Sequence, residues 1–268
     1  MAPQTLKYTT KLAGKRVLIL GGTSGIGFCV AEAALEHGAD VIISSSHAAK
    51  VTKSIARLQD AYPELTGRAQ AVSGYPCDLA DSAALEANLT RLLEQATDGG
   101  KRKLHHVAFT AGNALQLPAL QDLAVDAVHA AGTVRFLAPT ILAKILPQYM
   151  DRSPDNSFTV TGGAAAQRPS AGWSVMAAYA AGTEGLVRGL ALDLKPIRVN
   201  IVSPGPVHTE LFDGFGEIRD AVLEAFKEKS LTGAVGRPED VAEAYIYIMK
   251  DRYITGSCVA SNGGSVLA

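Results

Sequence analysis

Short apolar runs alternate with amphipathic stretches along most of this chain of 268 residues. Apolar runs bounded by glycine and polar residues predict strands at residues 16–20, 41–44, 69–75, 107–110, 158–161, 199–202 and 259–261. Between them, apolar residues at helical spacing predict helices at residues 26–37, 48–58, 82–94, 123–150, 174–194 and 238–250, the fourth of them broken near Pro139.

Regular alternation of strands and helices is typical of a parallel sheet that is covered by helices on both faces. The sequence therefore predicts an α/β fold, a Rossmann-type doubly wound sheet of about seven parallel strands. No internal repeat or linker-like change of composition divides the chain, so residues 1–268 are predicted to form a single domain. Residues 206–232 have the weakest strand and helix pattern, and we expect them to form a mobile flap over a site.

The composition changes this picture mainly by what it excludes. Apolar residues make up 47% of the chain, which is enough for a substantial core. The net charge is −1 and the longest basic run is the short segment 101–103, so no nucleic-acid partner is expected. The three cysteines are far apart, so we expect no disulfide framework, no metal site and a reduced, cytoplasmic location. No run of ~18 apolar residues predicts a membrane span.

A glycine-rich turn joins the first predicted strand to the first predicted helix. In such a turn, glycines let the chain bend sharply and approach a pyrophosphate, which the helix N-terminus then faces. The spacing Gly21-x-x-x-Gly25-x-Gly27 differs from G-x-G-x-x-G, but its place between strand and helix favours a dinucleotide site over an ordinary tight turn. The candidate cofactor-binding residues here are Gly21, Thr23, Ser24, Gly25, Ile26 and Gly27.

The end of the second predicted strand indicates which dinucleotide is bound. NAD enzymes place an acidic residue there to hold the ribose 2′-hydroxyl. This chain has Ser44, Ser45 and Ser46 instead, and their hydroxyls can donate hydrogen bonds to a 2′-phosphate. We therefore predict NADP(H) as the cofactor, with the alternative that the serines only cap the following helix.

With these residues in place, the chain resembles the short-chain dehydrogenase/reductase family over almost its whole length. The family's glycine turn is T-G-x-x-x-G-x-G, with Leu20 in place of the threonine. Further segments match in the same order, and the resemblance implies that they contact the adenine, ribose and nicotinamide: Cys77-Asp78-Leu79, then Thr110-Ala111-Gly112, then Pro204, Gly205, Val207 and Thr209. Arg198-Val199-Asn200 and Asn262-Gly263-Gly264 also match.

The catalytic residues that the family normally carries are absent. Members use a Tyr and a Lys four residues apart on one helix, with a Ser and an Asn upstream. Alignment of this chain with the family pattern puts Met176, Ala180, Gly163 and His129 at these positions. Two side chains remain as weak candidates for proton transfer: Tyr179, three residues after Met176, and His129. The alternatives are that Tyr179 packs or lines a pocket and that His129 is a buried structural residue.

Two further segments, Thr133–Phe136 and Pro169–Ser174, resemble an atypical fungal branch of the same family. That branch includes reductase/Diels–Alderases of bridged diketopiperazine indole alkaloid pathways, which use an Arg, an Asp and a Trp beside NADP. The resemblance implies catalytic roles for Arg135 and Trp173, while Ser170 stands at the position of the Asp. Arg135 could instead be a surface residue or part of a structural ion pair, and Trp173 could belong to the core.

The loss of the proton donor limits the possible chemistry. Reduction of a ketone generates an alkoxide that needs a proton, and general acid catalysis is worth ~10²–10⁴-fold. An iminium ion needs none in the hydride step. The sequence therefore favours a reductase of an imine, iminium or similarly activated small molecule in secondary metabolism, with a polycyclic apolar substrate against Trp173. A cyclase that uses NADP only as part of its pocket and a non-catalytic nucleotide-binding protein are the alternatives. The family resemblance also implies a homodimer or homotetramer.

Overall fold

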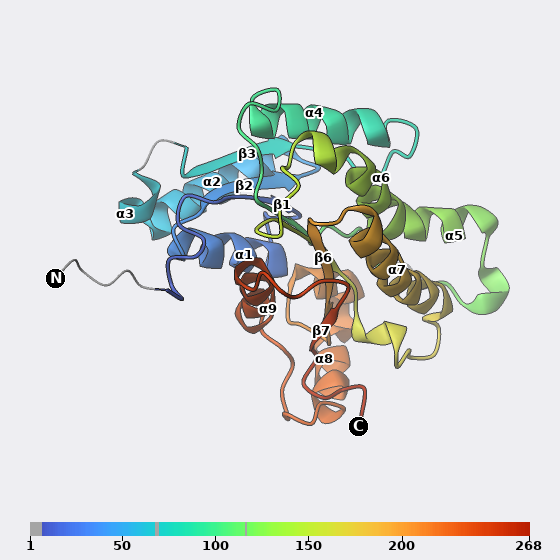
Figure 1. Cartoon of the computed structure of the whole chain (residues 1–268). Helices are drawn as coiled ribbons and strands as arrows, with labels where there is room; N and C mark the ends of the chain where they lie inside the picture. The colour runs from blue at the N-terminus through green and yellow to red at the C-terminus, as the bar shows by residue number, and fades with distance from the viewer. Residues whose placement is uncertain (1–6, 68–69, 116) are drawn as a thin grey trace.

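The structure is a computed structural model that describes residues 7–67, 70–115 and 117–268. Within these residues, seven parallel strands form one sheet in the order β3-β2-β1-β4-β5-β6-β7 (Figure 1). This confirms the predicted doubly wound sheet. The strands are β1 (Arg16–Leu20), β2 (Asp40–Ser45), β3 (Val72–Pro76), β4 (His106–Phe109), β5 (Ser157–Thr161), β6 (Arg198–Pro204) and β7 (Cys258–Ser261).

Helices connect the strands and cover both faces of the sheet. The α-helices of the described chain are α1 (Gly25–Glu36), α2 (Ala48–Ala61), α3 (Pro63–Thr66), α4 (Leu85–Thr97), α5 (Val125–Gly132), α6 (Ala138–Ile145), α7 (Ser174–Asp193), α8 (Arg219–Glu228) and α9 (Pro238–Lys250). Shorter helical turns are η1 (Leu120–Asp122), η2 (Thr133–Leu137), η3 (Leu146–Gln148), η4 (Ala164–Ala166) and η5 (Glu210–Ile218).

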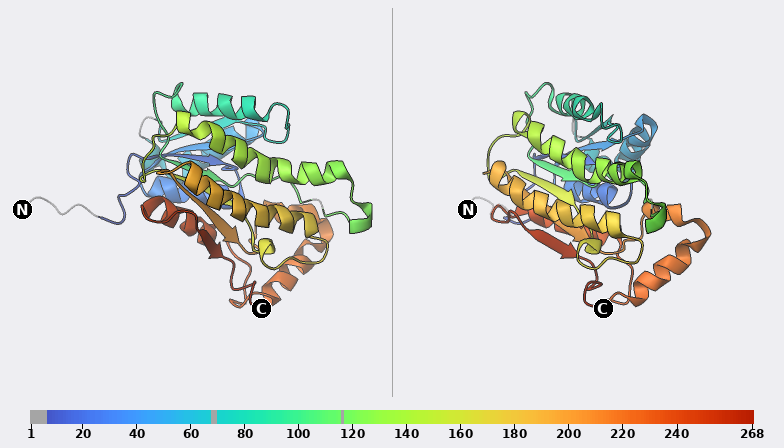
Figure 2. Two further views of the ribbon diagram at one scale, coloured as in Figure 1. Left: turned by 45° about the vertical axis from the view of Figure 1, so that its right-hand side comes forward. Right: turned by 90° about the vertical axis from the view of Figure 1, so that its right-hand side faces the viewer.

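The alternation of side chains along each strand creates two cores, one on each face of the sheet. Leu18 and Leu20 of β1 pack into a cluster with residues of α4, α6 and α7. Val17 and Ile19 of the same strand pack into the opposite cluster, with residues of α1, α2 and α9. The two helix layers are visible on either side of the sheet in Figure 2. Because both faces are covered, β1 is apolar from Val17 to Leu20 rather than alternating with polar residues.

The order of the strands determines where a site can form. The chain moves outward from β1 through β2 to β3, and then crosses back to place β4 on the other side of β1. In open α/β sheets, ligands bind in the crevice at the carboxyl ends of the strands at such a reversal. Four of the predicted cofactor segments follow β1, β2, β3 and β4 and therefore meet at this edge.

The long helix predicted at residues 123–150 is divided by a wider turn. The five residues of η2 form a π-helix between α5 and α6, and Pro139 lies in the first turn of α6. Proline has no N–H, and its ring collides with the carbonyl of the residue four positions earlier, which here is Arg135. A π turn relieves this collision, and such turns are frequent at functional sites. The break near Pro139 thus falls at the residue predicted to be catalytic.

Other boundaries differ from the prediction for local reasons. The helix predicted at residues 82–94 begins only at Leu85, because the Asp81 side chain accepts hydrogen bonds from the N–H groups of Ala83 and Ala84, at 2.9 and 3.2 Å, and forms a turn first. Strand β3 begins at Val72, and position 69 of the predicted strand lies outside the described residues. The segment 206–232 contains η5 and α8, so it has more helix than its sequence pattern indicated.

Surface features bear on the remaining predictions. None of the described helices has the length and apolar character that crossing a membrane requires. The described residues contain no group of side chains suited to hold a metal ion, and all three cysteines are free. Helix α7 exposes Gly185 and Gly189, and Leu192 on the same helix is 73% exposed. Assembly through this helix stays a prediction.

Candidate active site

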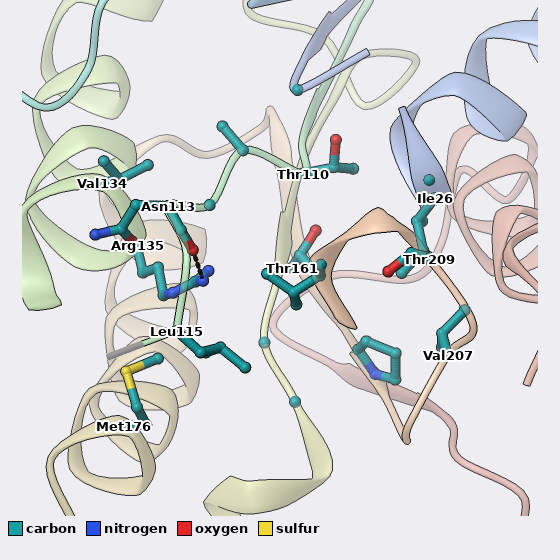
Figure 3. Close-up of a pocket in the computed structure, with 18 of the residues that line it drawn as sticks. Ile26, Thr110, Asn113, Leu115, Val134, Arg135, Thr161, Met176, Val207 and Thr209 are labelled. Carbon is teal, nitrogen blue, oxygen red and sulfur yellow. Dashed lines mark hydrogen bonds between the residues drawn. The ribbon is translucent and has the colours of Figure 1, made fainter. Parts of the chain in front are cut away.

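A cavity of about 990 Å³ opens at the carboxyl edge of the sheet. All of the predicted cofactor-binding residues line it, together with Arg135, Ser170, Trp173 and Tyr179. We call the part formed by the ends of β1 to β4 and the start of α1 the cofactor half. We call the part formed by η2, residues 164–173, the first turns of α7 and the flap at residues 206–232 the substrate half. Figure 3 shows Arg135 and Met176 on one side of the cavity, with Val207 and Thr209 across from them.

The glycine turn of the cofactor half requires glycine on both backbone and steric grounds. Gly21 has φ +85°, and a Cβ there would lie 2.7 Å from the backbone nitrogen of Ala111. A Cβ at Gly27 would lie 2.8 Å from the carbonyl carbon of Gly21. The carbonyl of Ser44 accepts hydrogen bonds from the N–H groups of Gly21 and Gly22, at 2.9 and 3.2 Å. The end of β2 therefore fixes the shape of the turn.

The N-terminus of α1 is suited to bind an anion. Its N-cap residue, Ser24, makes no side-chain capping hydrogen bond, and its first turn contains no acidic residue. The first backbone N–H groups of a helix have no partner within the helix, and the helix dipole adds positive potential there. These groups face the cavity, so the turn fits a pyrophosphate.

A basic residue that the sequence analysis missed lies beside the three serines. Lys50, in the first turn of α2, lines the cavity together with Ser44, Ser45 and Ser46. The N-cap of α2 is His47 and makes no side-chain capping bond, so the serines do not cap this helix. Ser45 and Ser46 are free to hydrogen-bond a ligand, and Lys50 adds a positive charge. This group of side chains fits a ribose 2′-phosphate.

Arg135 reaches the cavity from η2 by lying across a glycine. A Cβ on Gly112 would lie 2.8 Å from Cζ of the Arg135 guanidinium, so a larger residue there would displace the guanidinium. One guanidinium nitrogen, Nη2, donates a hydrogen bond to the carbonyl of Asn113 (Figure 3). Burial lowers the pKa of Arg135 from its ordinary value. Among the described residues no carboxylate pairs with it, so it is neither a surface residue nor a member of a structural ion pair.

Three of the four positions where the family resemblance places the catalytic residues line the cavity. They hold Gly163, Met176 and Ala180, none of which can ionise. The fourth, His129, does not line the cavity, and its side chain is exposed on α5. His129 is therefore neither near the reacting space nor buried, contrary to both interpretations of it. The sequence alone does not determine how a helix is rotated about its axis. In the structure, α5 is rotated so that His129 faces solvent.

The hydroxyl groups near these positions are already engaged. Tyr179 donates to the carbonyl of Val128 at 3.1 Å, and its ring occupies the space where Gly132 lacks a side chain. Thr161 donates to the carbonyl of Phe109 at 2.7 Å and lies 2.5 Å from the Tyr245 hydroxyl, which must then be the donor of that pair. Tyr179 and Thr161 thus have no proton directed at the cavity. The contacts of Tyr179 agree with the interpretation that its side chain packs against neighbouring residues or lines a pocket.

Aromatic side chains form much of the wall of the substrate half. Trp173, the N-cap residue of α7, is half-buried and lines the cavity, so it is not a core residue. From the flap, Phe212 and Phe226 line the cavity at a centroid distance of 5.9 Å, and Phe215 stacks on Phe212 from behind at 5.7 Å. Ser170 lines the same space with an exposed hydroxyl. These walls suit a flat apolar molecule.

The flap also extends to the cofactor half. A Cβ on Gly25, the first residue of α1, would lie 3.0 Å from Cγ2 of Thr209 and 3.4 Å from Oε2 of Glu210. Glu210 lines the cavity and so places a carboxylate close to the anion-binding helix terminus. Nothing in the sequence points to Glu210, because only the fold brings the segment after β6 against α1.

Comparisons with known proteins agree with this geometry. The sequence profile of the SDR-like Rossmann domain matches residues 8–268. The chain is 46% identical to the short-chain dehydrogenase/reductase malC of Malbranchea aurantiaca over 268 residues, all of both chains. It is 44% identical to the short-chain dehydrogenase/reductase fsr5 of Gibberella fujikuroi, with 98% of each chain covered.

Solved structures lead to the same family. The structure of the MalC reductase/Diels–Alderase of Malbranchea aurantiaca superposes with a TM-score of 0.89 at 44% identity, covering 97% of this chain and 99% of that one. A short-chain dehydrogenase of Burkholderia cenocepacia in complex with NADP superposes with a TM-score of 0.80 at 29% identity, covering 95% and 99%. The fold, the glycine turn and these likenesses agree, and this chain belongs to the short-chain dehydrogenase/reductase family.

Proposed function

We propose that this protein is an NADPH-dependent reductase of an imine, iminium or similarly activated small molecule in fungal secondary metabolism. In this proposal it works without the Ser-Tyr-Lys residues of its family. One observation carries the proposal. Arg135 enters the substrate half with no carboxylate partner among the described residues, while Gly163, Met176 and Ala180 offer no proton there. The intact cofactor half and the NADP in the Burkholderia cenocepacia relative support the choice of cofactor.

Different residues of this chain would bind the cofactor and the substrate. Bound in the cofactor half, NADPH would supply a hydride. Lys50 and the serines after β2 would hold its 2′-phosphate, and the start of α1 its pyrophosphate. Arg135 uses one of its five N–H donors on Asn113 and keeps the others for the substrate. Fixed donors of this kind stabilise negative charge that develops on oxygen or nitrogen, without having to transfer a proton.

A second candidate is a cyclase that uses bound NADP only as part of its pocket. Ser170 favours a cyclase. Its hydroxyl cannot shuttle a proton or balance a cation as a carboxylate at the same position would. The relative from Malbranchea aurantiaca is itself described as a reductase/Diels–Alderase. Holding a reactive substrate in one conformation, against Trp173 and the flap, would be the source of the rate gain. A collapsed cleft would have favoured a non-catalytic nucleotide-binding protein. The cavity is open, which favours an enzyme over this alternative.

Transfer of isotope separates these functions. The purified protein is incubated with [4-²H]NADPH and with the intermediates that accumulate in a producing strain without this protein. A reductase consumes NADPH in stoichiometric amounts and places deuterium on carbon, whereas a cyclase forms the same product with NADP⁺ and NADPH. Arg135→Met should abolish turnover, and Arg188→Met, an exposed arginine of α7 outside the cavity lining, should not. Product formation without deuterium would refute the reductase assignment.

A further inference from the structure

The charges that line the cavity are divided unevenly between its halves. Among the described residues, the carboxylates of the lining are Asp78, which follows β3, and Glu210, which lies beside Gly25. Asp78 belongs to the cofactor half, whereas Glu210 belongs to the flap but lies against the start of α1. The substrate half has three cationic side chains, Arg135, Arg168 and Lys229, and Glu210 is the one carboxylate among its described lining residues.

We call Arg168 and Lys229 the rim cations, because both line the cavity beside residues that contact the C-terminal segment. Arg168 Nη1 donates to the carbonyl of Ser265 at 3.5 Å. Ser230, next to Lys229, donates from its hydroxyl to the carbonyl of Gly263 at 3.1 Å. The C-terminal segment 263–265 therefore joins the residues before α7 to the end of α8. Figures 1 and 2 show the C-terminus beside α8 from every side drawn.

The rim cations have no counter-ion in the described part of the chain. Arg168 has the carbonyl of Ser265 as its hydrogen-bond partner, and the Lys229 ammonium pairs with no carboxylate, whereas nearby Lys227 pairs with Glu224 at 2.8 Å. Phe212, Phe226 and Trp173 line the same cavity as Arg135 and the rim cations. Like charges that converge on a partly apolar cavity repel one another, and a bound anion relieves this repulsion.

We propose that the substrate carries an acidic group, a carboxylate or an ionised enol, which Arg168 and Lys229 bind at the rim. The apolar body of the substrate then lies against the aromatic walls, and its reducible carbon reaches Arg135. The inference rests on the proposed function, because it assigns the charge of that reductase's substrate. If the electrophile is a cationic iminium, the acidic group of the same molecule would balance its charge.

A matched pair of bicyclic probes tests the inference without turnover. Binding of 2-naphthoate and of 2-naphthamide to the NADP⁺-saturated protein is measured by isothermal titration calorimetry. The two probes have nearly the same apolar area and differ in charge. We expect naphthoate to bind about tenfold more tightly at low salt, as two partly exposed ion pairs allow, and the ratio to shrink as salt rises.

Charge-removing variants locate the effect. Arg168→Gln and Lys229→Gln should each reduce the ratio several-fold, and the double variant should bring it close to one. Lys227→Gln, an exposed lysine of the same helix that does not line the cavity, should leave it unchanged. Equal binding of the two probes by the unmodified protein, failure to bind either at millimolar concentration, or a preference that survives the double variant would each overturn the proposal. Because no product is needed, this result is independent of the deuterium-transfer test.

Discussion

Gly112→Ala should inactivate this protein without touching Arg135 itself. The backbone of Gly112 has no left-handed φ, so alanine is compatible with it. A new Cβ would lie 2.8 Å from Cζ of Arg135, whereas unstrained carbon contacts are about 3.5–4.0 Å. The guanidinium must therefore move by about 1 Å, and the end of a long side chain can do so at little cost in folding stability. We expect the free energy of unfolding to change by less than about 1 kcal/mol.

The effect on turnover should be much larger than the effect on stability. A misplacement of about 1 Å in a catalytic group can cost ~10²-fold in rate, and removal of one stabilising donor costs ~10²–10³-fold. We therefore expect Gly112→Ala to lower kcat about 10²-fold, close to the loss in Arg135→Met. The assay is single-turnover oxidation of NADPH at saturating substrate, followed by absorbance, with urea unfolding measured in parallel.

Gly163→Ala is the matched control. Gly163 lines the same cavity, its backbone is extended, and a Cβ there would meet nothing within 4 Å. We expect its kcat to stay within about threefold of the unmodified protein. If both Gly112→Ala and Gly163→Ala retained full activity, the position of the Arg135 guanidinium over Gly112 would have no role in the reaction.

Three further predictions concern the cofactor and stability. Lys50→Ala should raise the Kd of NADPH about tenfold and leave that of NADH unchanged, as measured by fluorescence titration; equal losses for both would place Lys50 away from the 2′-phosphate. Glu210→Gln should tighten NADPH binding several-fold, because the carboxylate beside Gly25 repels a pyrophosphate, while Glu217→Gln, on the same flap but outside the cavity lining, should change nothing. Burial, followed by the Arg198 charge, lowers the pKa of His106 well below its ordinary value, so folding favours the neutral ring. Its contribution to stability is then fully present above pH ~6.5 and is lost as the pH falls toward the folded-state pKa. The urea midpoint should therefore drop between pH 7 and pH 5 more steeply in the unmodified protein than in His106→Gln.

The sequence was sufficient for the sheet and for the position of the glycine turn at its edge, because both depend on local patterns. Apolar runs identified every strand, and the glycine turn had to follow β1 and precede α1 for any pyrophosphate to bind. Lys50 was missed because its direction depends on the rotation of α2 about its axis, which an amphipathic pattern fixes only coarsely.

The substrate half was harder to predict, because it is assembled from distant segments. Arg168 and Lys229 are far apart in the sequence, and the C-terminal residues contact Arg168 and Ser230, the neighbour of Lys229. His129 was placed in the site by alignment with the family, and the structure turns it to solvent on α5. Arg135 was selected from its likeness to a fungal branch, but its seat on Gly112 depends on the π turn of η2. Propensity and spacing contain no signal for such a contact.

The charge of Arg135 has a consequence for the direction of the reaction. An oxidised nicotinamide ring is cationic, and a reduced ring is neutral. Among the described residues, the Arg135 guanidinium has a backbone carbonyl as its hydrogen-bond partner and no counter-ion, and such a cation disfavours the charge of the oxidised ring in the same cavity, where water screens poorly. The site should therefore retain the spent coenzyme less firmly than the fresh one. This difference in affinity would speed the release of the oxidised coenzyme and make the reverse oxidation of an alcohol or amine slow.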